Sequence, residues 1–261
     1  MGSTGYFARA ARSVFGDRTL WWRILALAVV GIVPLLGSLV QTGYMMVIMR
    51  DAAWSIDRGL PAFSERDQIF RQGLVGLLVS LVWGLALAAV LIVPIIIWVV
   101  VIVTTGTEPT VPWWFGVAIS VFLAPFIVFM YVAFVRSAVY QKVSPGLSVS
   151  GVRQLIAANR SGFKGVALPA VAVGLLSAAL SAPSPLIVRQ LETSAFSVFV
   201  FPYAWAFLLS LFTLPLHLTI ARSYGLWAAE TDPASWPPLE PAVEAHNVVP
   251  DEAIAAAQQA L

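Results

Sequence analysis

The chain has no cysteine, only two histidines and only 13 acidic residues among its 261. The absence of cysteine excludes disulfides, thiolate metal sites and cysteine nucleophiles. Charged residues make up 11% of the sequence, against about 25% in soluble proteins. Apolar residues are abundant instead, since they account for 59% of the chain and the mean hydropathy is +0.87. This composition indicates an integral membrane protein.

The sequence also lacks the motifs that carry common enzyme chemistry. It has no H-E-x-x-H, no G-x-S-x-G, no phosphate-binding P-loop and no paired carboxylates. We therefore expect no enzyme activity, no catalytic residue, no cofactor and no bound metal. The one weak candidate for holding a cofactor is His217, by ligating a haem or pigment metal. A single histidine near a membrane interface is more often a hydrogen-bonded packing residue.

Five long apolar blocks run through the chain. A bilayer crossing needs about 20 apolar residues, and the last four blocks predict spans at residues 74–103, 115–135, 166–182 and 195–220. None of these spans contains an aspartate, glutamate, lysine or arginine. Because ionisable residues inside spans mark proton and ion pathways, transport coupled to protons or sodium is disfavoured. The expected fold class is an all-α membrane protein with four full transmembrane helices.

The first apolar block, residues 20–49, is expected to differ from the others. Lysine and arginine cluster on both of its sides, and positive charge collects on the cytoplasmic side of a membrane. Pro34 and Gly37 lie in its middle, where a helix breaks and turns. We expect Leu20–Val33 and Ser38–Met49 to form a helical hairpin that enters the bilayer to half its depth and returns. The alternative is one kinked span with the amino terminus outside.

This arrangement divides the chain into three parts. Residues 1–19 form an amino-terminal segment, 20–222 the membrane domain with a cytoplasmic connection at 50–73, and 223–261 a tail. Under the hairpin reading, fourteen of the fifteen basic residues lie in the cytoplasm. Both termini are therefore expected to be cytoplasmic.

The amino-terminal segment predicts a helix that lies on the membrane surface. Its apolar side chains recur at helical spacing on one side, and Arg9 and Arg12 lie elsewhere. The expected apolar side comprises Phe7, Ala8, Ala11, Val14 and Phe15.

A further amphipathic helix is expected from Ser148 or Ser150 onward. Arg153 and Arg160 line one of its faces, and Lys164 follows them. These bases are candidates for facing anionic lipid headgroups or a protein partner, at about 1 kcal/mol for each basic residue near a charged surface. Ordinary anchoring by positive charge is favoured over recognition of a specific lipid. The opposite, apolar face comprises Val152, Leu155, Ile156 and Phe163.

The tail is acidic and rich in proline and alanine. It has no lysine or arginine, and the last 39 residues carry a net charge of −6 while the rest of the chain carries +8. Asp251 and Glu252 open an alanine-rich stretch that is able to form a short helix. We expect the tail to dock on a partner or on the chain's own basic cytoplasmic face, or else to remain solvated.

Several short motifs follow the predicted hairpin. They are Gly43-Tyr44, Arg50, Gly59-Leu60-Pro61-Ala62-Phe63 and Ile69-Phe70-Arg71-Gln72-Gly73-Leu74. In these motifs the chain resembles an uncharacterised prokaryotic family of multi-spanning membrane proteins, domain of unknown function 4013. The resemblance continues through the basic connection and Leu216-His217, but Ala62 stands where the family often has an acidic residue. It implies a helical protein of the prokaryotic inner membrane and brings no established activity.

The expected function is that of a non-catalytic integral membrane subunit or scaffold within a larger membrane complex. Its partners would be membrane lipids, through the basic cytoplasmic face, and other proteins or further copies of the chain. A nucleic-acid partner is not expected. The alternative is a transporter or channel component for a neutral or hydrophobic solute, with the cavity formed by proline-kinked helices. A lipid-processing enzyme is the third and least favoured possibility.

Overall fold

A computed structural model describes residues 5–56, 59–105, 113–181, 195–231 and 236–237. Within these ranges the chain is helical and contains no strand, so the expected all-α class is confirmed. Four of the described helices are long and apolar enough to cross a membrane. They are α4 (Arg66–Thr105), α5 (Trp113–Tyr140), α8 (Arg160–Ser181) and α10 (Ala195–Ala229).

The first apolar block forms two helices, α2 (Leu20–Gly31) and α3 (Pro34–Ala53), with a break at residues 32–33. Proline lacks an N–H and fits the first turn of a helix, so α3 begins at Pro34 rather than at Ser38 as expected. Gly37 then lies inside α3, where a Cβ would come 2.8 Å from the carbonyl oxygen of Val30. This glycine allows the two helices to approach each other closely just after the break.

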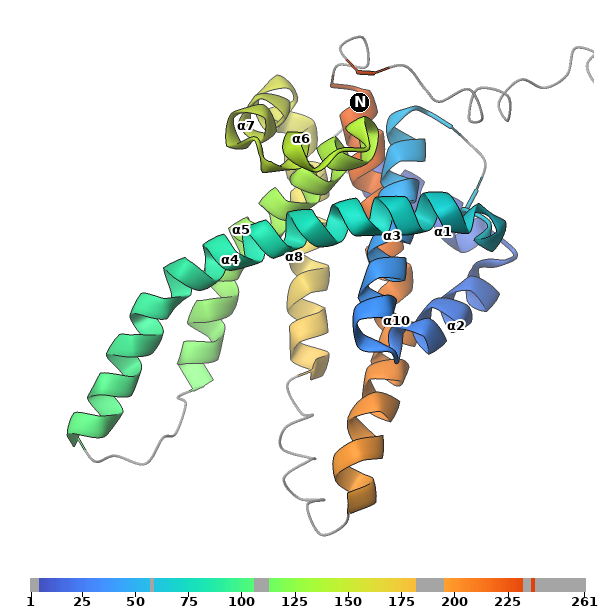
Figure 1. Ribbon diagram of the computed structural model, residues 1–261. Coiled ribbons are helices and arrows are strands. Elements are labelled where there is room, and N and C mark those ends of the chain that lie inside the picture. The colour runs from blue at the N-terminus through green and yellow to red at the C-terminus, as the bar shows by residue number, and fades with distance from the viewer. Residues whose placement is uncertain (1–4, 57–58, 106–112, 182–194, 232–235, 238–261) are drawn as a thin grey trace, which may run out of the picture.

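The turn between α2 and α3 lies beside the middle of α10. Met49 is in contact with Gly225, since a Cβ at Gly225 would come 2.4 Å from the Met49 carbonyl oxygen. The two helices run in the same direction (Figure 1), so Pro34, fifteen residues before Met49, lies near the level of residue 210. The tip is apolar and exposed, with Leu35 79% accessible.

Helix α4 crosses α3 at a point where the two backbones touch (Figure 1). A Cβ at Gly43 would come 2.0 Å from the carbonyl oxygen of Ile69, and a Cβ at Gly73 would come 2.2 Å from that of Leu39. Only glycine permits this approach. Both glycines belong to the motifs that carry the family resemblance, so those motifs include the residues that fix this crossing.

Helix α1 (Gly5–Gly16) packs on α10 with a face that differs from the expected one. Its buried residues are Tyr6, Ala10 and Val14, and only Val14 belongs to the expected apolar side. Phe15 remains 49% exposed. The expectation was wrong in this respect because it ignored the hydrogen bonds that draw Tyr6 inward.

The basic connection contains two short helices, α6 (Val143–Leu147) and α7 (Val149–Ala158), and a third short helix, η1 (Phe63–Glu65), precedes α4. Helix α7 begins after Ser148, one of the two starts expected, and Ser148 caps it, because its hydroxyl oxygen accepts a hydrogen bond from the Gly151 N–H at 3.2 Å.

The expected amphipathic helix does not continue to Phe163, however. Asn159 adopts a non-helical conformation between α7 and α8, and its side chain accepts a hydrogen bond from the Gly162 N–H at 2.9 Å. Phe163 therefore lies on α8, where its ring packs against that of Trp227 with centroids 5.4 Å apart.

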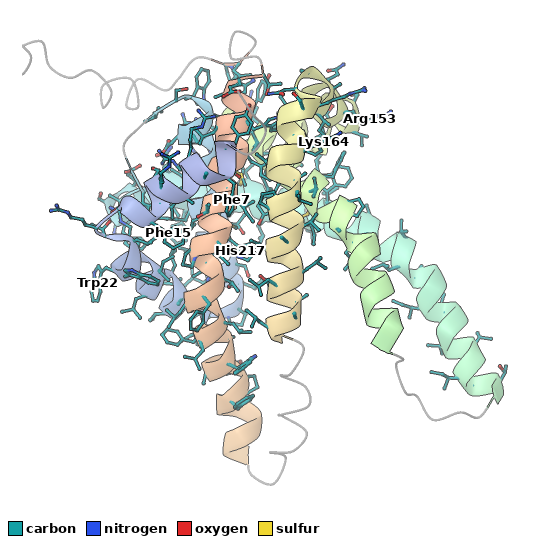
Figure 2. The ribbon with its side chains drawn as sticks, turned by 180° about the vertical axis from the view of Figure 1, so that it is seen from behind. Phe7, Phe15, Trp22, Arg153, Lys164 and His217 are labelled. Carbon is teal, nitrogen blue, oxygen red and sulfur yellow. The ribbon has the colours of Figure 1, made fainter. Side chains whose placement is uncertain are left out.

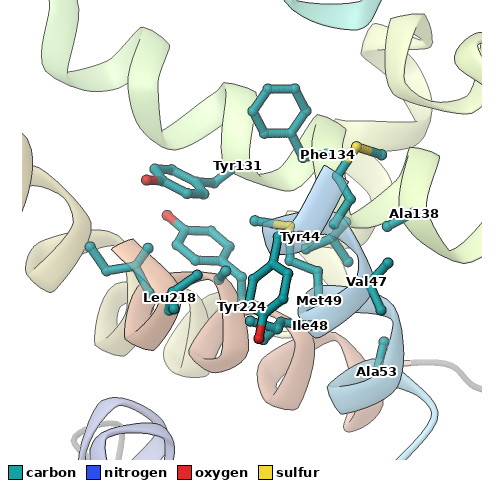
Figure 3. Close-up of a cluster of buried hydrophobic side chains, with 14 of the residues drawn as sticks. Tyr44, Val47, Ile48, Met49, Ala53, Tyr131, Phe134, Ala138, Leu218 and Tyr224 are labelled. Atoms are coloured by element: carbon teal, nitrogen blue, oxygen red, sulfur yellow. The ribbon is translucent and has the colours of Figure 1, made fainter. Parts of the chain in front are cut away.

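The buried core lies at the end of the bundle where α1 begins and α10 ends. The rings of Tyr131 and Tyr224 stack there with centroids 5.2 Å apart, next to α3 residues such as Met49 (Figure 3). Helix α10 continues to Ala229, past the boundary expected at residue 222. At the opposite end the helices diverge (Figure 1) and expose apolar side chains such as Val100 and Val103.

Candidate functional site

The most organised polar feature is a loop whose three successive carbonyls are each bound by a side chain from a different helix. Arg222 of α10 donates to the Gly59 carbonyl at 3.5 Å. Arg23 of α2 donates to the Leu60 carbonyl, and Tyr44 of α3 donates to the Pro61 carbonyl at 2.8 Å. We call these three side chains, together with Asp17, the carbonyl clamp.

Asp17 joins the clamp from the segment between α1 and α2. One carboxylate oxygen accepts from the backbone N–H and the hydroxyl of Thr19, at 2.8 and 2.6 Å, at the start of α2. The other accepts from the Leu60 N–H at 3.1 Å and lies 3.9 Å from Arg23. Burial raises the pKa of Asp17, but the hydrogen bonds from Thr19 and Leu60 and the charge of Arg23 outweigh it, so that the pKa lies below its usual value.

Tyr44 and Arg222 are buried and Asp17 and Arg23 are partly buried, so the groups of the clamp depend on one another. Tyr44 has no exposed surface, and the side chains of Asp17 and Arg23 are 15% and 17% exposed. A buried polar group that loses its hydrogen-bond partner costs about 1–3 kcal/mol. The clamp thus links the end of α1 and the helices α2, α3 and α10 to one loop.

The loop has the local conformation that this arrangement requires. Gly59 has a φ of +73°, which favours glycine, and it presents its carbonyl toward Arg222. The ring of Phe63 packs on that of Tyr44 with centroids 5.9 Å apart. The Gly59–Phe63 motif therefore serves as the backbone counterpart of the clamp.

The chemistry available to the clamp depends on which of its oxygen atoms already accept hydrogen bonds. Carbonyls able to ligate a cation already accept hydrogen bonds, and the Asp17 carboxylate is engaged on both oxygens. Among the described residues, no group of three histidine, aspartate or glutamate side chains is placed to hold a metal ion. The arrangement is suited to holding helices together.

A second polar junction joins α1 to the end of α10. Tyr6 donates its hydroxyl to one carboxylate oxygen of Glu230, and Arg9 donates to the other at 3.0 Å. Burial raises the pKa of Glu230. The hydrogen bonds from Tyr6 and Arg9 and the charge of Arg9 have the larger effect, so that the pKa lies below its usual value. Asn159 reaches the same junction, since its amide lies 3.5 Å from the Tyr6 hydroxyl.

His217 lies on α10, partly buried, with Nδ1 2.8 Å from the carbonyl oxygen of Thr213 one turn earlier (Figure 2). That bond to its own helix is the one expected of a packing histidine. The chain's other histidine, His246, lies outside the described residues.

The basic residues singled out from the sequence lie on two helices, not on one face of a single helix as expected. Arg153 on α7 and Arg160 and Lys164 on α8 are all exposed, and Figure 2 shows Arg153 and Lys164 at the same end of the molecule. Their proposed acidic counterparts, Asp251 and Glu252, lie outside the described residues.

Sequence reasoning missed the clamp. Arg23 entered the prediction only as one of the basic residues around the first apolar block, and Asp17 was not considered. The available signal was an arginine one turn into an apolar helix with an aspartate six residues before it. Nothing in the spacing identifies the loop carbonyls as the groups they bind.

Comparison with known proteins matches the chain to one family model. The model, described as a protein of unknown function (DUF4013), matches residues 26–188. This range includes Tyr44 and the loop carbonyls of the clamp, while Asp17, Arg23 and Arg222 lie outside it. No curated protein and no solved structure matches the chain.

Proposed function

Because the chain belongs to the DUF4013 family, whose function is unknown, we propose from its own geometry that it is a non-catalytic subunit or scaffold within a larger complex of the prokaryotic inner membrane. The observation that carries the proposal is the carbonyl clamp. Its buried charged and phenolic groups are used to bind a loop backbone and join four segments of the chain.

The proposed topology places both termini in the cytoplasm and the α2–α3 turn at half the depth of the bilayer. Two observations support it. Tyr6 and Arg9 near the start of α1 bind Glu230 just after α10, so these two parts of the chain lie at the same end of the bundle. The turn lies near the level of residue 210 rather than at the far end of α10.

Exposed tryptophans support the same placement of α2. Trp21 and Trp22 are 65% and 74% exposed at the start of the helix, and Figure 2 shows Trp22 on the outer side of the molecule. Tryptophan is enriched where lipid headgroups meet the hydrocarbon region. The hairpin would then enter the bilayer at these residues, with Leu35 at its deepest point.

The surface available to partner helices is the diverging half of the bundle. Leu81, Leu85 and Val103 of α4 are between 57% and 75% exposed. The pocket between α5 and α8, which is lined by Ile127, Gly174 and other apolar residues, has a volume of about 70 Å³. Because small-molecule sites usually have about 300–1,000 Å³, this pocket gives the transporter alternative no support.

The proposal is tested by purifying the full chain from its native membrane in a mild detergent and identifying co-purifying proteins by quantitative mass spectrometry. The scaffold reading predicts partners that remain at fixed stoichiometry through size-exclusion chromatography. A matched purification of a variant with Leu81→Ser and Leu85→Ser should retain the fold and lose partners. A chain that elutes alone in both preparations contradicts the proposal.

A further inference from the structure

A pocket with a polar wall lies at the cytoplasmic end of the proposed topology, next to the carbonyl clamp, with which it shares Arg222. It has a volume of about 300 Å³, and three segments contribute to it: α1, the end of α3 and α10. Arg9 and Ser13 lie one turn apart on α1, and Arg222 lies on α10. The lining residues are Arg9, Ser13, Ala52, Ser55, Ile56, Arg222 and Leu226.

We propose that this pocket binds the phosphate group of an anionic ligand. Two arginines and two serines are among the residues that line one small volume, and arginine is the residue best matched to phosphate because its N–H donors form a planar fork. The remaining wall of Ala52, Ile56 and Leu226 is apolar.

The backbone conformation of Ser55 at the end of α3 places this residue in the pocket wall. Helix α3 ends in a Schellman motif, in which the Ser55 N–H donates to the Ala52 carbonyl at 3.1 Å and the Ile56 N–H donates to the Asp51 carbonyl at 2.8 Å. The residue at this left-handed position is usually glycine, yet Ser55 holds a φ of +57°. A side chain is thus kept where glycine would be less strained, and this side chain lines the pocket.

The charges around the pocket determine which substitutions are informative. Arg9 is 42% exposed on its side chain and paired with Glu230 at 3.0 Å. Arg222 is 6% exposed and also donates to Gly59, so that its replacement would disturb the clamp. Arg9→Gln is therefore the direct test, and Glu230→Gln breaks the same ion pair while leaving the pocket more positive.

The experiment uses the full chain in phosphatidylcholine nanodiscs and measures the rise in melting temperature on addition of an anion. One arm titrates inorganic phosphate against chloride at constant ionic strength, and the other titrates phosphatidylglycerol into the nanodisc. Stabilisation by both anions shows recognition of the phosphate group itself, and stabilisation by one alone identifies the lipid or the soluble source. Stabilisation by neither overturns the proposal.

The variants separate binding from folding. Arg9→Gln should weaken the apparent affinity roughly tenfold, as expected for loss of a charge-assisted hydrogen bond. Arg12→Gln, on the same helix but outside the pocket, should leave it unchanged, and Glu230→Gln should leave it unchanged or strengthen it. Ser55→Gly should raise the melting temperature without ligand and weaken binding, a combination that a folding defect does not produce. Wild-type affinity in Arg9→Gln or Ser55→Gly, or an equal loss in Arg12→Gln or Glu230→Gln, overturns the proposal.

Discussion

The hydroxyl of Tyr44 donates a hydrogen bond to the carbonyl of Pro61 at 2.8 Å, in a site where Tyr44 has no exposed surface. This bond joins α3 to the loop before α4, and α3 meets α4 itself at the Gly43–Gly73 crossing. Tyr44 and Gly43, which are adjacent in the sequence, therefore both hold α3 against the loop and the helix that follows it.

Removal of the Tyr44 hydroxyl should destabilise the protein. Tyr44→Phe leaves the Pro61 carbonyl buried without this donor and should lower the free energy of unfolding by about 1–3 kcal/mol. The measurement is thermal unfolding in detergent. Tyr203→Phe, at a tyrosine that is 48% exposed on α10, is the control and should change stability by less than about 0.5 kcal/mol. Equal effects of the two substitutions would show that the hydrogen bond to Pro61 contributes nothing.

The α3–α4 crossing should not tolerate a methyl group. In Gly43→Ala the new Cβ would lie 2.0 Å from the Ile69 carbonyl oxygen, and overpacking of this kind costs about 1–3 kcal/mol or more. Gly84→Ala is the matched control on α4, since nothing lies within 4 Å of its Cβ position. Stability of that variant should be unchanged or higher by up to about 1 kcal/mol. A Gly43→Ala variant as stable as Gly84→Ala would contradict the observed crossing.

Asp17 should make part of the stability depend on pH. Its pKa in the folded protein lies below the ordinary value of 3.8, so the ionised carboxylate stabilises the fold fully above that value. The contribution is lost as the pH falls through the lowered pKa of the folded state. Asp17→Asn should therefore be less stable than wild type at pH 7, and the difference should narrow below about pH 4. Melting curves between pH 7 and pH 3 test this, and a difference that stays constant or widens toward acid would refute it.

The beginning of the tail should dock on the membrane domain through Trp236. Its ring packs edge-on against that of Trp54, with centroids 5.5 Å apart. Truncation after Asp232 should leave membrane insertion and the helical bundle intact. It should weaken partner retention, most clearly at low salt, because the exposed ion pairs that the tail would make contribute only about 0–1 kcal/mol each and salt screens them further. Pull-down at two salt concentrations measures this, with Trp236→Ala as a milder variant. If the truncated chain retains all of its partners at both concentrations, the tail does not contribute to partner binding and this prediction is wrong.

The number of long helices, the break in the first apolar block and the start of α7 after Ser148 were all predictable from the sequence. Each depends on local chemistry, namely apolar length, a proline at residue 34 and a hydroxyl before a helix. The packed face of α1 was not predictable, because Tyr6 turns inward to bind Glu230, more than 200 residues away. The carbonyl clamp was missed for the same reason, since Arg23 binds a backbone carbonyl that carries no sequence signal.

The surfaces proposed for lipids, partners and phosphate all depend on residues 20–49 entering and leaving the bilayer on the cytoplasmic side. The absence of native cysteine makes the direct measurement clean: labelling of single-cysteine variants in intact cells with a membrane-impermeant thiol reagent. Thr107→Cys, in the connection between the first two predicted spans, should be labelled from outside. Gly5→Cys should be labelled only after the membrane is permeabilised. Labelling of Gly5→Cys in intact cells would place the amino terminus outside and contradict the hairpin.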